Sequence, residues 1–273
     1  MELVVARNRA ELVKARGEGP IALVPTMGAL HEGHRALIRE ARALAARVVV
    51  SVFVNPLQFG PSEDLSRYPR TLEADLDACR AEGVAVVFTP AAEDMYAADR
   101  QVGVSAGHMG TIVEGTARPG HFDGVLTVVL KLFNLVQPDL ACFGQKDAQQ
   151  LAVIRRMVAD LDLPIGIVGV PTVREPDGLA MSSRNRFLSA QDRERALALS
   201  RALSAGAVEA TPSRVVAVAR EVLGAAGLDP DYLTLVDPAT FEAVPEAYKG
   251  EAVLAVAARV GRTRLIDNAL IRL

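Results

Sequence analysis

The chain has 273 residues, of which 50% are hydrophobic and 23% charged, and its formal net charge is −3. This balance excludes intrinsic disorder and fibrous architectures, and the length suits one large or two modest domains. The weak charge and the lack of an apolar run of about 20 residues give no support to nucleic-acid binding or membrane insertion. We therefore expect a globular protein with neither nucleic acid nor a membrane as its partner.

The two cysteines, Cys79 and Cys142, are far apart in the sequence and have no CxxC spacing. This pattern predicts neither a disulfide framework nor a zinc ribbon. The first residues lack the basic start, long apolar middle and cleavage site of a secretory signal. We expect a protein of the reducing cytoplasm.

Short β-branched runs alternate with segments of helical periodicity over the first two thirds of the chain. Strands are predicted at residues 21–24, 47–54, 84–88, 139–143 and 165–170. Helices are predicted at residues 34–46, 71–82, 124–136 and 147–161. Near-continuous apolar strands alternating with helices are typical of a parallel sheet covered on both faces. We therefore predict an α/β fold with a doubly wound, Rossmann-like sheet in residues 1–172.

The pattern changes after Pro171, where a segment rich in Pro, Gly and Ser extends to residue 189. Two helices are predicted next, at residues 190–209 and 213–226, and then strands at 232–236, 251–260 and 264–269. Strands with short connections favour an antiparallel arrangement. Residues 173–273 are therefore expected to form a smaller α+β domain, a lid over the first.

The loop after the first predicted strand has the sequence PTMGALHEGH and leads directly into a helix. Gly28 and Gly33 allow close approach of backbone to a ligand, and a helix start offers free N–H groups. His31 and His34 lie on one face, and their spacing is one residue too short for a zinc-protease motif. The loop suits a triphosphate, although the histidines are also consistent with a purely local role as helix caps.

Polar residues also follow the later strands, at the sheet edge where parallel sheets bind ligands. Asn55 and Gln58 follow the second strand and offer neutral hydrogen-bonding groups, or else form a simple Asn-Pro turn. Lys146 follows the fourth strand, and faces the histidine loop if strand order reverses between the first and fourth strands. Its alternative is a surface lysine paired with Asp147.

Three further segments are candidates for ligand contacts. The Met-Ser-Ser-Arg segment that ends at Arg184 resembles a phosphate clamp, or is a Ser-rich linker. Arg118 and His121 lie in a glycine-rich loop, residues 115–124, that a subunit contact would explain equally well. Residues 60–64 form a lid or an ordinary surface loop.

Six motifs occur in the order PTMGALHEGH, FVNPLQFG, YPRT, RPGHFDGV, FGQKDAQQ and AMSSRN. The first and last resemble the HIGH and KMSKS motifs of class I nucleotidyltransferases and aminoacyl-tRNA synthetases. Together the six resemble the pantothenate synthetase (pantoate–β-alanine ligase) family. Ser183 stands where the synthetases have a second lysine, which argues against a tRNA synthetase.

The resemblance implies condensation of (R)-pantoate with β-alanine through a pantoyl-adenylate, with ATP and Mg²⁺ and release of pyrophosphate and AMP. It also implies a homodimer. His34, His31, Lys146 and Arg184 are then the catalytic candidates, with His34 at the position of the proton donor. His34, Lys146 and Arg184 are expected to place positive charge against the phosphates. The pantoate-binding glutamines correspond to Gln58 and Gln150, and Asn55 adjoins them. The nucleotide contacts fall on Met27, Gly28, Ala29, Leu30, His31, Glu32, Gly33, His34, Gly144, Gln145, Lys146, Asp147, Val173, Met181, Ser182, Ser183 and Arg184.

Two alternatives belong to other classes of protein. A different nucleotidyltransferase of HIGH type, such as a cytidylyltransferase, would leave a nucleotide on its product and would not need β-alanine. A nucleotide-binding module without turnover is disfavoured because His34, Lys146 and Arg184 occur together.

Overall fold

The computed structural model describes residues 2–60 and 65–273. Within this part of the chain, six parallel strands form one sheet in the order β1-β4-β3-β2-β5-β6. Their bounds are β1 Val4–Ala6, β2 Ile21–Thr26, β3 Arg47–Val52, β4 Val86–Phe88, β5 Leu140–Gly144 and β6 Gly166–Val170. The central strand β2 pairs with β3 on one side and with β5 on the other, so strand order reverses at β2 and β5. The prediction that Lys146 faces the histidine loop depended on this reversal of strand order.

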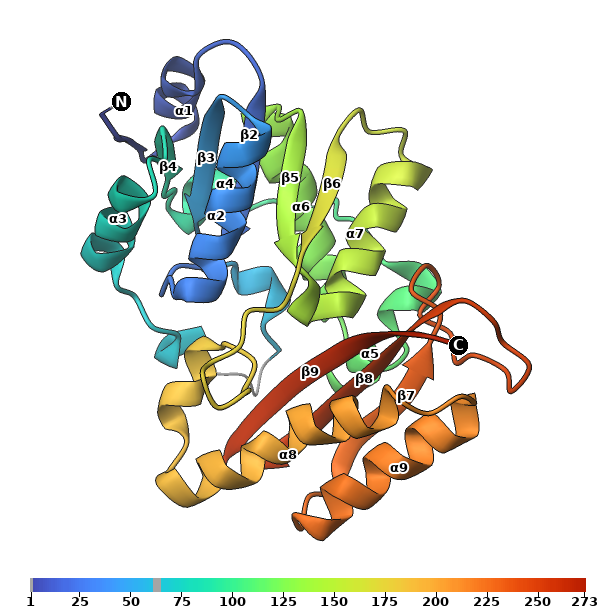
Figure 1. Cartoon of the computed structure of the whole chain (residues 1–273). Coiled ribbons are helices and arrows are strands. Elements are labelled where there is room, and N and C mark those ends of the chain that lie inside the picture. Colours follow the sequence, from blue (N-terminus) through green and yellow to red (C-terminus); the bar gives the residue numbers. More distant parts are fainter. Residues whose placement is uncertain (1, 61–64) are drawn as a thin grey trace.

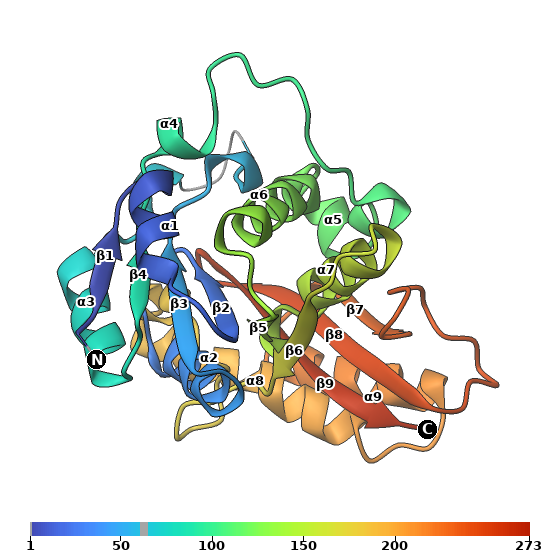
Figure 2. The same cartoon turned by 90° about the horizontal axis from the view of Figure 1, so that it is seen from above.

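Helices cover both faces of this sheet, as Figure 2 shows. On one face lie α1 (Arg9–Arg16), α6 (His121–Val136) and α7 (Ala148–Asp160), whose apolar residues share one core with the sheet. On the other face, α2 (Glu32–Leu44) and α3 (Leu72–Ala81) bury Leu37, Ile38 and Leu76 in a second core. The short helices α4 (Ala92–Met95) and α5 (Glu114–Ala117) lie in the connection to α6. The predicted doubly wound α/β sheet is confirmed.

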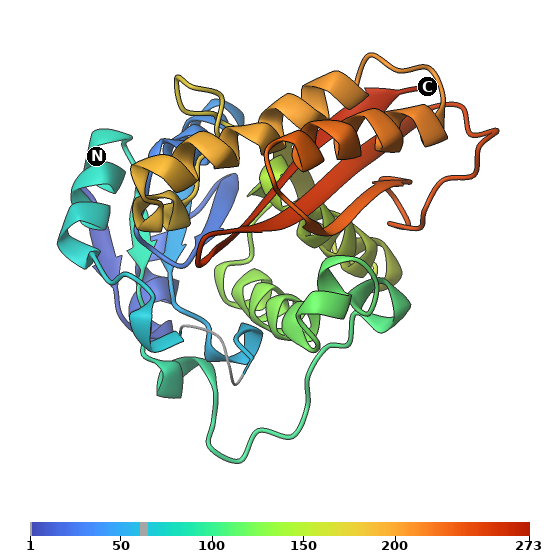
Figure 3. The ribbon, with the colours of Figure 1, turned by 90° about the horizontal axis from the view of Figure 1, so that it is seen from below.

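The rest of the chain forms a smaller antiparallel unit below the parallel sheet (Figure 1). Three described strands pair in the order β7-β8-β9, with bounds Pro230–Val236, Glu251–Val260 and Thr263–Arg272. Helices α8 (Ala190–Gly206) and α9 (Pro212–Ala225) cover one face of this sheet, and the other faces the parallel-sheet unit (Figure 3). The apolar residues of the second unit form a core of their own. A small cluster that includes Ala152 of α7 and Phe241 joins the two units.

The structure differs from the predicted elements mainly at their ends. The edge strand β1 and helix α1 carried too few periodic residues to be predicted. Helix α6 begins at His121 and not at residue 124, so Gly124 lies inside the helix, where its lack of a side chain allows the helix to approach the chain at Leu57. Among the described helices, none combines the length with the hydropathy that a membrane span requires.

Candidate active site

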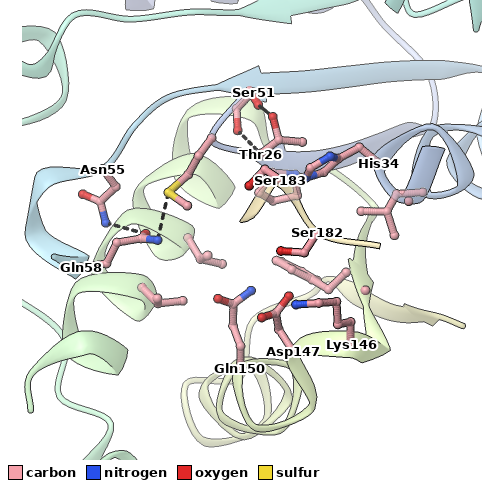
Figure 4. A pocket seen from close by; sticks show the side chains of 18 of the residues that line it. Thr26, His34, Ser51, Asn55, Gln58, Lys146, Asp147, Gln150, Ser182 and Ser183 are labelled. Carbon is pink, nitrogen blue, oxygen red and sulfur yellow. Dashed lines mark hydrogen bonds between the residues drawn. The ribbon is translucent and has the colours of Figure 1, made fainter. Parts of the chain in front are cut away.

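A cavity lies at the reversal point, between the carboxyl ends of β2 and β5 and the segment that begins the second unit. Figure 4 shows side chains from several parts of the chain around it, among them His34, Asn55 with Gln58, Gln150 of α7, and Ser182 with Ser183. This is where an open parallel sheet binds its ligand. The cavity is therefore the candidate active site.

The two histidines of the HxxH segment start helix α2 as a reciprocal cap. The Gly33 N–H donates to Nδ1 of His31 (3.2 Å), and the His31 N–H donates to Nδ1 of His34 (3.3 Å). A neutral imidazole whose Nδ1 accepts a hydrogen bond carries its proton on Nε2. Each ring therefore keeps an Nε2–H donor, and both rings line the cavity. The local capping role and the ligand-facing role expected from the sequence are compatible.

Both histidines are neutral near pH 7. The pKa of His34 is lowered from 6.5 to about 3, chiefly by burial and to a lesser extent by the nearby His31 and Lys146. The pKa of His31 is also lowered, chiefly by burial and then by Lys146. This corrects the expectation that His34 adds positive charge to the site, because it can act only as a neutral donor at that pH. Lys146 and Arg184 also line the cavity, as cations.

The loop before these histidines is held by a carboxylate that the sequence did not reveal. Asp75 of α3, only 2% exposed, accepts hydrogen bonds from the N–H groups of Ala29 (3.0 Å) and Leu30 (2.8 Å). Gly28 (φ +81°) and Ala29 (φ +50°) both have left-handed backbone, which is strained for an alanine. Asp75 therefore stabilises a strained loop and fixes where His31 begins the helix.

Asn55 orients Gln58 on the opposite side of the cavity. The buried Asn55 side chain donates through Nδ2 to Oε1 of Gln58 (3.0 Å) and to the Gly124 carbonyl (3.1 Å), and Oδ1 accepts from Tyr96 (2.8 Å). The Gln58 Nε2 group is thereby turned toward the cavity, where its contact is the weak acceptor Sδ of Met27 at 3.1 Å (Figure 4). The hydrogen bonds of Asn55 thus suit it to hold Gln58.

The Met181–Arg184 segment is anchored within its own unit. Ser182 caps the 3₁₀ turn η5 (Ser183–Phe187) by accepting from the Arg184 N–H (3.2 Å). Asn185 donates to Glu175 (2.6 Å), and Arg193 of α8 bonds the same carboxylate (2.6 Å). The segment therefore forms a structured wall of the cavity. It is not the Ser-rich linker that the sequence also allowed.

Arg118 and His121 also line the cavity, beside Gln58. Arg118 donates to the Gln58 carbonyl (3.3 Å), and Nδ1 of His121 lies 2.9 Å from the same oxygen. Contacts within the chain explain two glycines of their loop, because a Cβ on Gly115 would lie 2.0 Å from the Gly110 carbonyl oxygen and one on Gly124 2.2 Å from that of Leu57. These glycines therefore give no separate support to a subunit contact.

Most of the predicted site residues meet at this one cavity. Those that line it are Met27, His31, Gly33, His34, Asn55, Gln58, Gly144, Lys146, Asp147, Gln150, Val173, Met181, Ser182, Ser183 and Arg184. Gly28, Ala29, Leu30, Glu32 and Gln145 are not among the described residues that line it. The Ala29 and Leu30 N–H groups are engaged by Asp75, and Glu32 pairs with Arg39 on the outer face of α2.

Other lining residues were not singled out from the sequence. Thr26 is the last residue of β2 and Ser51 the last but one of the neighbouring β3, and apolar residues of α6, among them Val125 and Leu132, form one wall. Tyr68, which the YPRT motif contains, also lines the cavity, as Ser183 does. The proposed lid at residues 60–64 falls, apart from Gly60, outside the described residues.

A parallel sheet with this strand order and a His-x-x-His helix start at its reversal point place the chain among the Rossmann-like α/β proteins that bind their ligand at that point. Comparison with known proteins specifies the family. The family model for pantoate–β-alanine ligase matches residues 3–270. The pantothenate synthetase of Acidothermus cellulolyticus is 59% identical over 97% of this chain and 90% of its own length. That of Thermobifida fusca is 58% identical, over 97% and 94%.

Solved structures agree with these relatives. The pantothenate synthetase of Thermus thermophilus superposes with a TM-score of 0.94, at 46% identity and over 98% of this chain and 99% of its own. The pantoate–β-alanine ligase of Francisella tularensis, in complex with β-γ ATP and β-alanine, has a TM-score of 0.82 at 32% identity, with 98% of both chains covered. The chain belongs to the pantoate–β-alanine ligase family, the enzymes that join pantoate to β-alanine with ATP.

Proposed function

We propose that the chain condenses (R)-pantoate with β-alanine in two steps through a pantoyl-adenylate, within the cavity at the reversal point. The observation that carries this proposal is the division of that cavity into two ends. Donors suited to phosphate lie at one end, and amide groups suited to hydroxyls and a carboxylate lie at the other. The relative from Francisella tularensis, crystallised with β-γ ATP and β-alanine, supports the same two ligands here.

In the first step a pantoate carboxylate oxygen attacks the α-phosphorus of ATP, and the bond from that phosphorus to pyrophosphate breaks. Negative charge increases on the phosphate oxygens as this happens, so groups that stabilise the charge lower the barrier. The Nε2–H groups of His31 and His34 and the cations Lys146 and Arg184 fulfil this role. With its pKa near 3, His34 acts as a fixed hydrogen-bond donor and not as an acid that releases a proton.

Pantoate binds at the amide end. Gln58 presents Nε2 to the cavity because Asn55 holds its Oε1, and Gln150 projects from α7 on the facing side (Figure 4). Neutral amides bind hydroxyl and carboxylate oxygens without lowering the reactivity of the carboxylate as strongly as a cation would. This arrangement leaves the carboxylate nucleophilic while directing it toward the phosphates.

In the second step the β-alanine amine attacks the acyl carbon of the adenylate and a C–N bond forms. The bond from that carbon to the phosphate oxygen breaks, AMP leaves, and the proton lost by the amine passes to solvent. We assign the β-alanine carboxylate to Arg118, the cation that lines the cavity beside Gln58. The Met181–Arg184 segment and Tyr68 enclose the phosphate end, which limits hydrolysis of the adenylate by water.

The lining of the cavity fits a magnesium ion that arrives together with the nucleotide. No group of three or more His, Cys, Asp or Glu in the described chain could hold a metal, and Asp147 is the one carboxylate among the described residues that line the cavity. Mg²⁺ commonly uses one or two carboxylates together with phosphate oxygens and water. When bound, the ion would neutralise phosphate charge, with Asp147 as its protein ligand.

Three broader features belong to the same proposal. Residues 1–172 and 173–273 act as two domains, which the separate apolar core of the second sheet supports. The resemblance to the family supports a cytoplasmic homodimer. Sedimentation at micromolar concentration tests the dimer, and a clean species at 29.0 kDa would contradict it.

Incubation with ATP, pantoate and β-alanine, followed by mass identification of the products, tests the function. Pantothenate, AMP and pyrophosphate are expected in equal amounts. ADP would indicate a kinase, and a nucleotide joined to the product would indicate a cytidylyltransferase.

In the same assay His34→Ala and Lys146→Ala are each expected to lower turnover by about a hundredfold or more with circular dichroism unchanged. Losses below tenfold in both would contradict their assigned roles.

A further inference from the structure

The second unit reaches the active site through adjacent residues of β9. Nδ2 of Asn268 donates to two consecutive carbonyl oxygens, those of Gln145 (2.9 Å) and Lys146 (2.8 Å). Asp267, only 3% exposed, accepts two hydrogen bonds from Arg174 (2.7 and 3.1 Å), in the segment that begins the second unit. In Figure 1, β9 (red) passes below the ends of α6 and α7.

The two carbonyls belong to the 3₁₀ turn η4 (Gln145–Asp147), which lies directly before helix α7. The N-cap of α7 is Asp147, so the oxygens of Gln145 and Lys146 precede the first i→i+4 hydrogen bond of that helix. Only the NH₂ end of the Asn268 amide can donate to them, which fixes its orientation. The Lys146 backbone is therefore held from the second unit.

The same face of β9 is fixed at a second point. Alternate residues of a strand share a face, so Arg264 lies on the face that carries Asn268. Arg264 forms a two-bond ion pair with Glu114 of α5 (2.7 and 2.9 Å), which is 6% exposed. With two anchors on the parallel-sheet unit, β9 holds Asn268 at a defined distance from the Lys146 backbone.

We propose that Asn268 is a positioning residue for Lys146, so that adenylation depends on docking of the second unit against the start of α7. Asn268 acts on the backbone of Lys146, and through it on the place of the ammonium group relative to the phosphates. A displacement of about 1 Å in a group that stabilises developing charge can cost up to a hundredfold in rate. The inference rests on the proposed role of Lys146.

The test compares Asn268→Asp with the wild-type chain and with Lys146→Met. Asn268→Asp keeps the shape of the side chain but removes both donors and sets a carboxylate against two carbonyl oxygens. Pantoate-dependent exchange of labelled pyrophosphate into ATP should fall by about tenfold or more, with the KM for pantoate within about twofold. In the Lys146→Met background, the further loss should shrink to less than about threefold, because the two residues act as one unit.

If Asn268→Asp folds poorly, Asn268→Ala takes its place in the test, because it removes the same donors without adding charge. The same loss of exchange is expected. Glu242→Gln is the matched control, because Glu242 joins the same two units through an exposed contact with His108 (2.6 Å) away from the cavity. It should retain wild-type exchange. If Asn268→Asp lowered exchange by the same factor in the wild-type and Lys146→Met backgrounds, Asn268 would not act through Lys146. This inference would then be wrong, while the proposed role of Lys146 would stand. Full exchange in Lys146→Met itself would overturn the role of Lys146, and the inference with it.

Discussion

Replacement of Asp75 by asparagine tests whether the histidine loop is shaped from α3. The carboxylate accepts from the N–H groups of Ala29 and Leu30 and from the Thr71 hydroxyl (3.3 Å), and it is buried. Asparagine keeps one acceptor oxygen, so its NH₂ group must face one of the two N–H donors. An unsatisfied buried N–H costs about 1 to 3 kcal/mol, and the remaining bonds lose their charge assistance. We expect the free energy of unfolding to fall by about 2 to 4 kcal/mol.

The expected loss extends to the reaction, because the loop sets the position of His31. Pyrophosphate exchange should fall by about tenfold or more under conditions where Asp75→Asn remains folded. Urea denaturation measures the stability. Asp77→Asn is the matched control, since Asp77 lies on the same helix and forms only an exposed pair with Arg80 (2.6 Å) among its described contacts, worth less than about 1 kcal/mol. If the two variants had the same stability and exchange, Asp75 would not hold the loop.

Three other changes have defined outcomes. Because the pKa of His34 is near 3 when folded and near 6.5 when unfolded, the unfolded chain binds the proton first as pH falls. As pH falls from 6.5 to 3, His34 should therefore lower the free energy of unfolding by at most about 1.4 kcal/mol per pH unit. Denaturation at several pH values should show that the free energy of unfolding depends less steeply on pH in His34→Gln than in the wild-type chain. Gln58→Leu and Gln150→Leu should each weaken pantoate binding by about 1 to 3 kcal/mol in calorimetry, and an equal loss of ATP binding would move them to the nucleotide site. Gly124→Ala places a Cβ 2.2 Å from the Leu57 carbonyl oxygen, so it should destabilise the fold by about 1 to 3 kcal/mol; an unchanged melting temperature would contradict this.

The parallel sheet could be predicted because its strands are nearly continuous apolar runs, which only a sheet covered on both faces requires. The position of Lys146 beside the histidine loop also followed, once strand order was assumed to reverse between the strands now labelled β2 and β5. Motifs at the ends of strands report on a site because the sheet itself brings these ends together.

Residues that act on the site from a distance could not be predicted. Asp75 reads as one more acidic residue of an amphipathic helix, and its contact with Leu30 spans 45 residues of sequence. Asn268 lies in the middle of a strand and carries no motif, and its contact depends on how the two units dock. The pKa of His34 depends on burial in the assembled cavity, so the sequence suggested a positive charge where the structure has a neutral ring.

The adenylate step is the central claim, and isotope exchange tests it most directly. If pantoate attacks ATP before the amine takes part, labelled pyrophosphate will enter ATP when pantoate is present and β-alanine is absent. We expect this exchange to require pantoate and to fall by about a hundredfold or more in Lys146→Ala. Exchange that strictly requires β-alanine would contradict the two-step mechanism and with it the proposed roles of the phosphate-end residues.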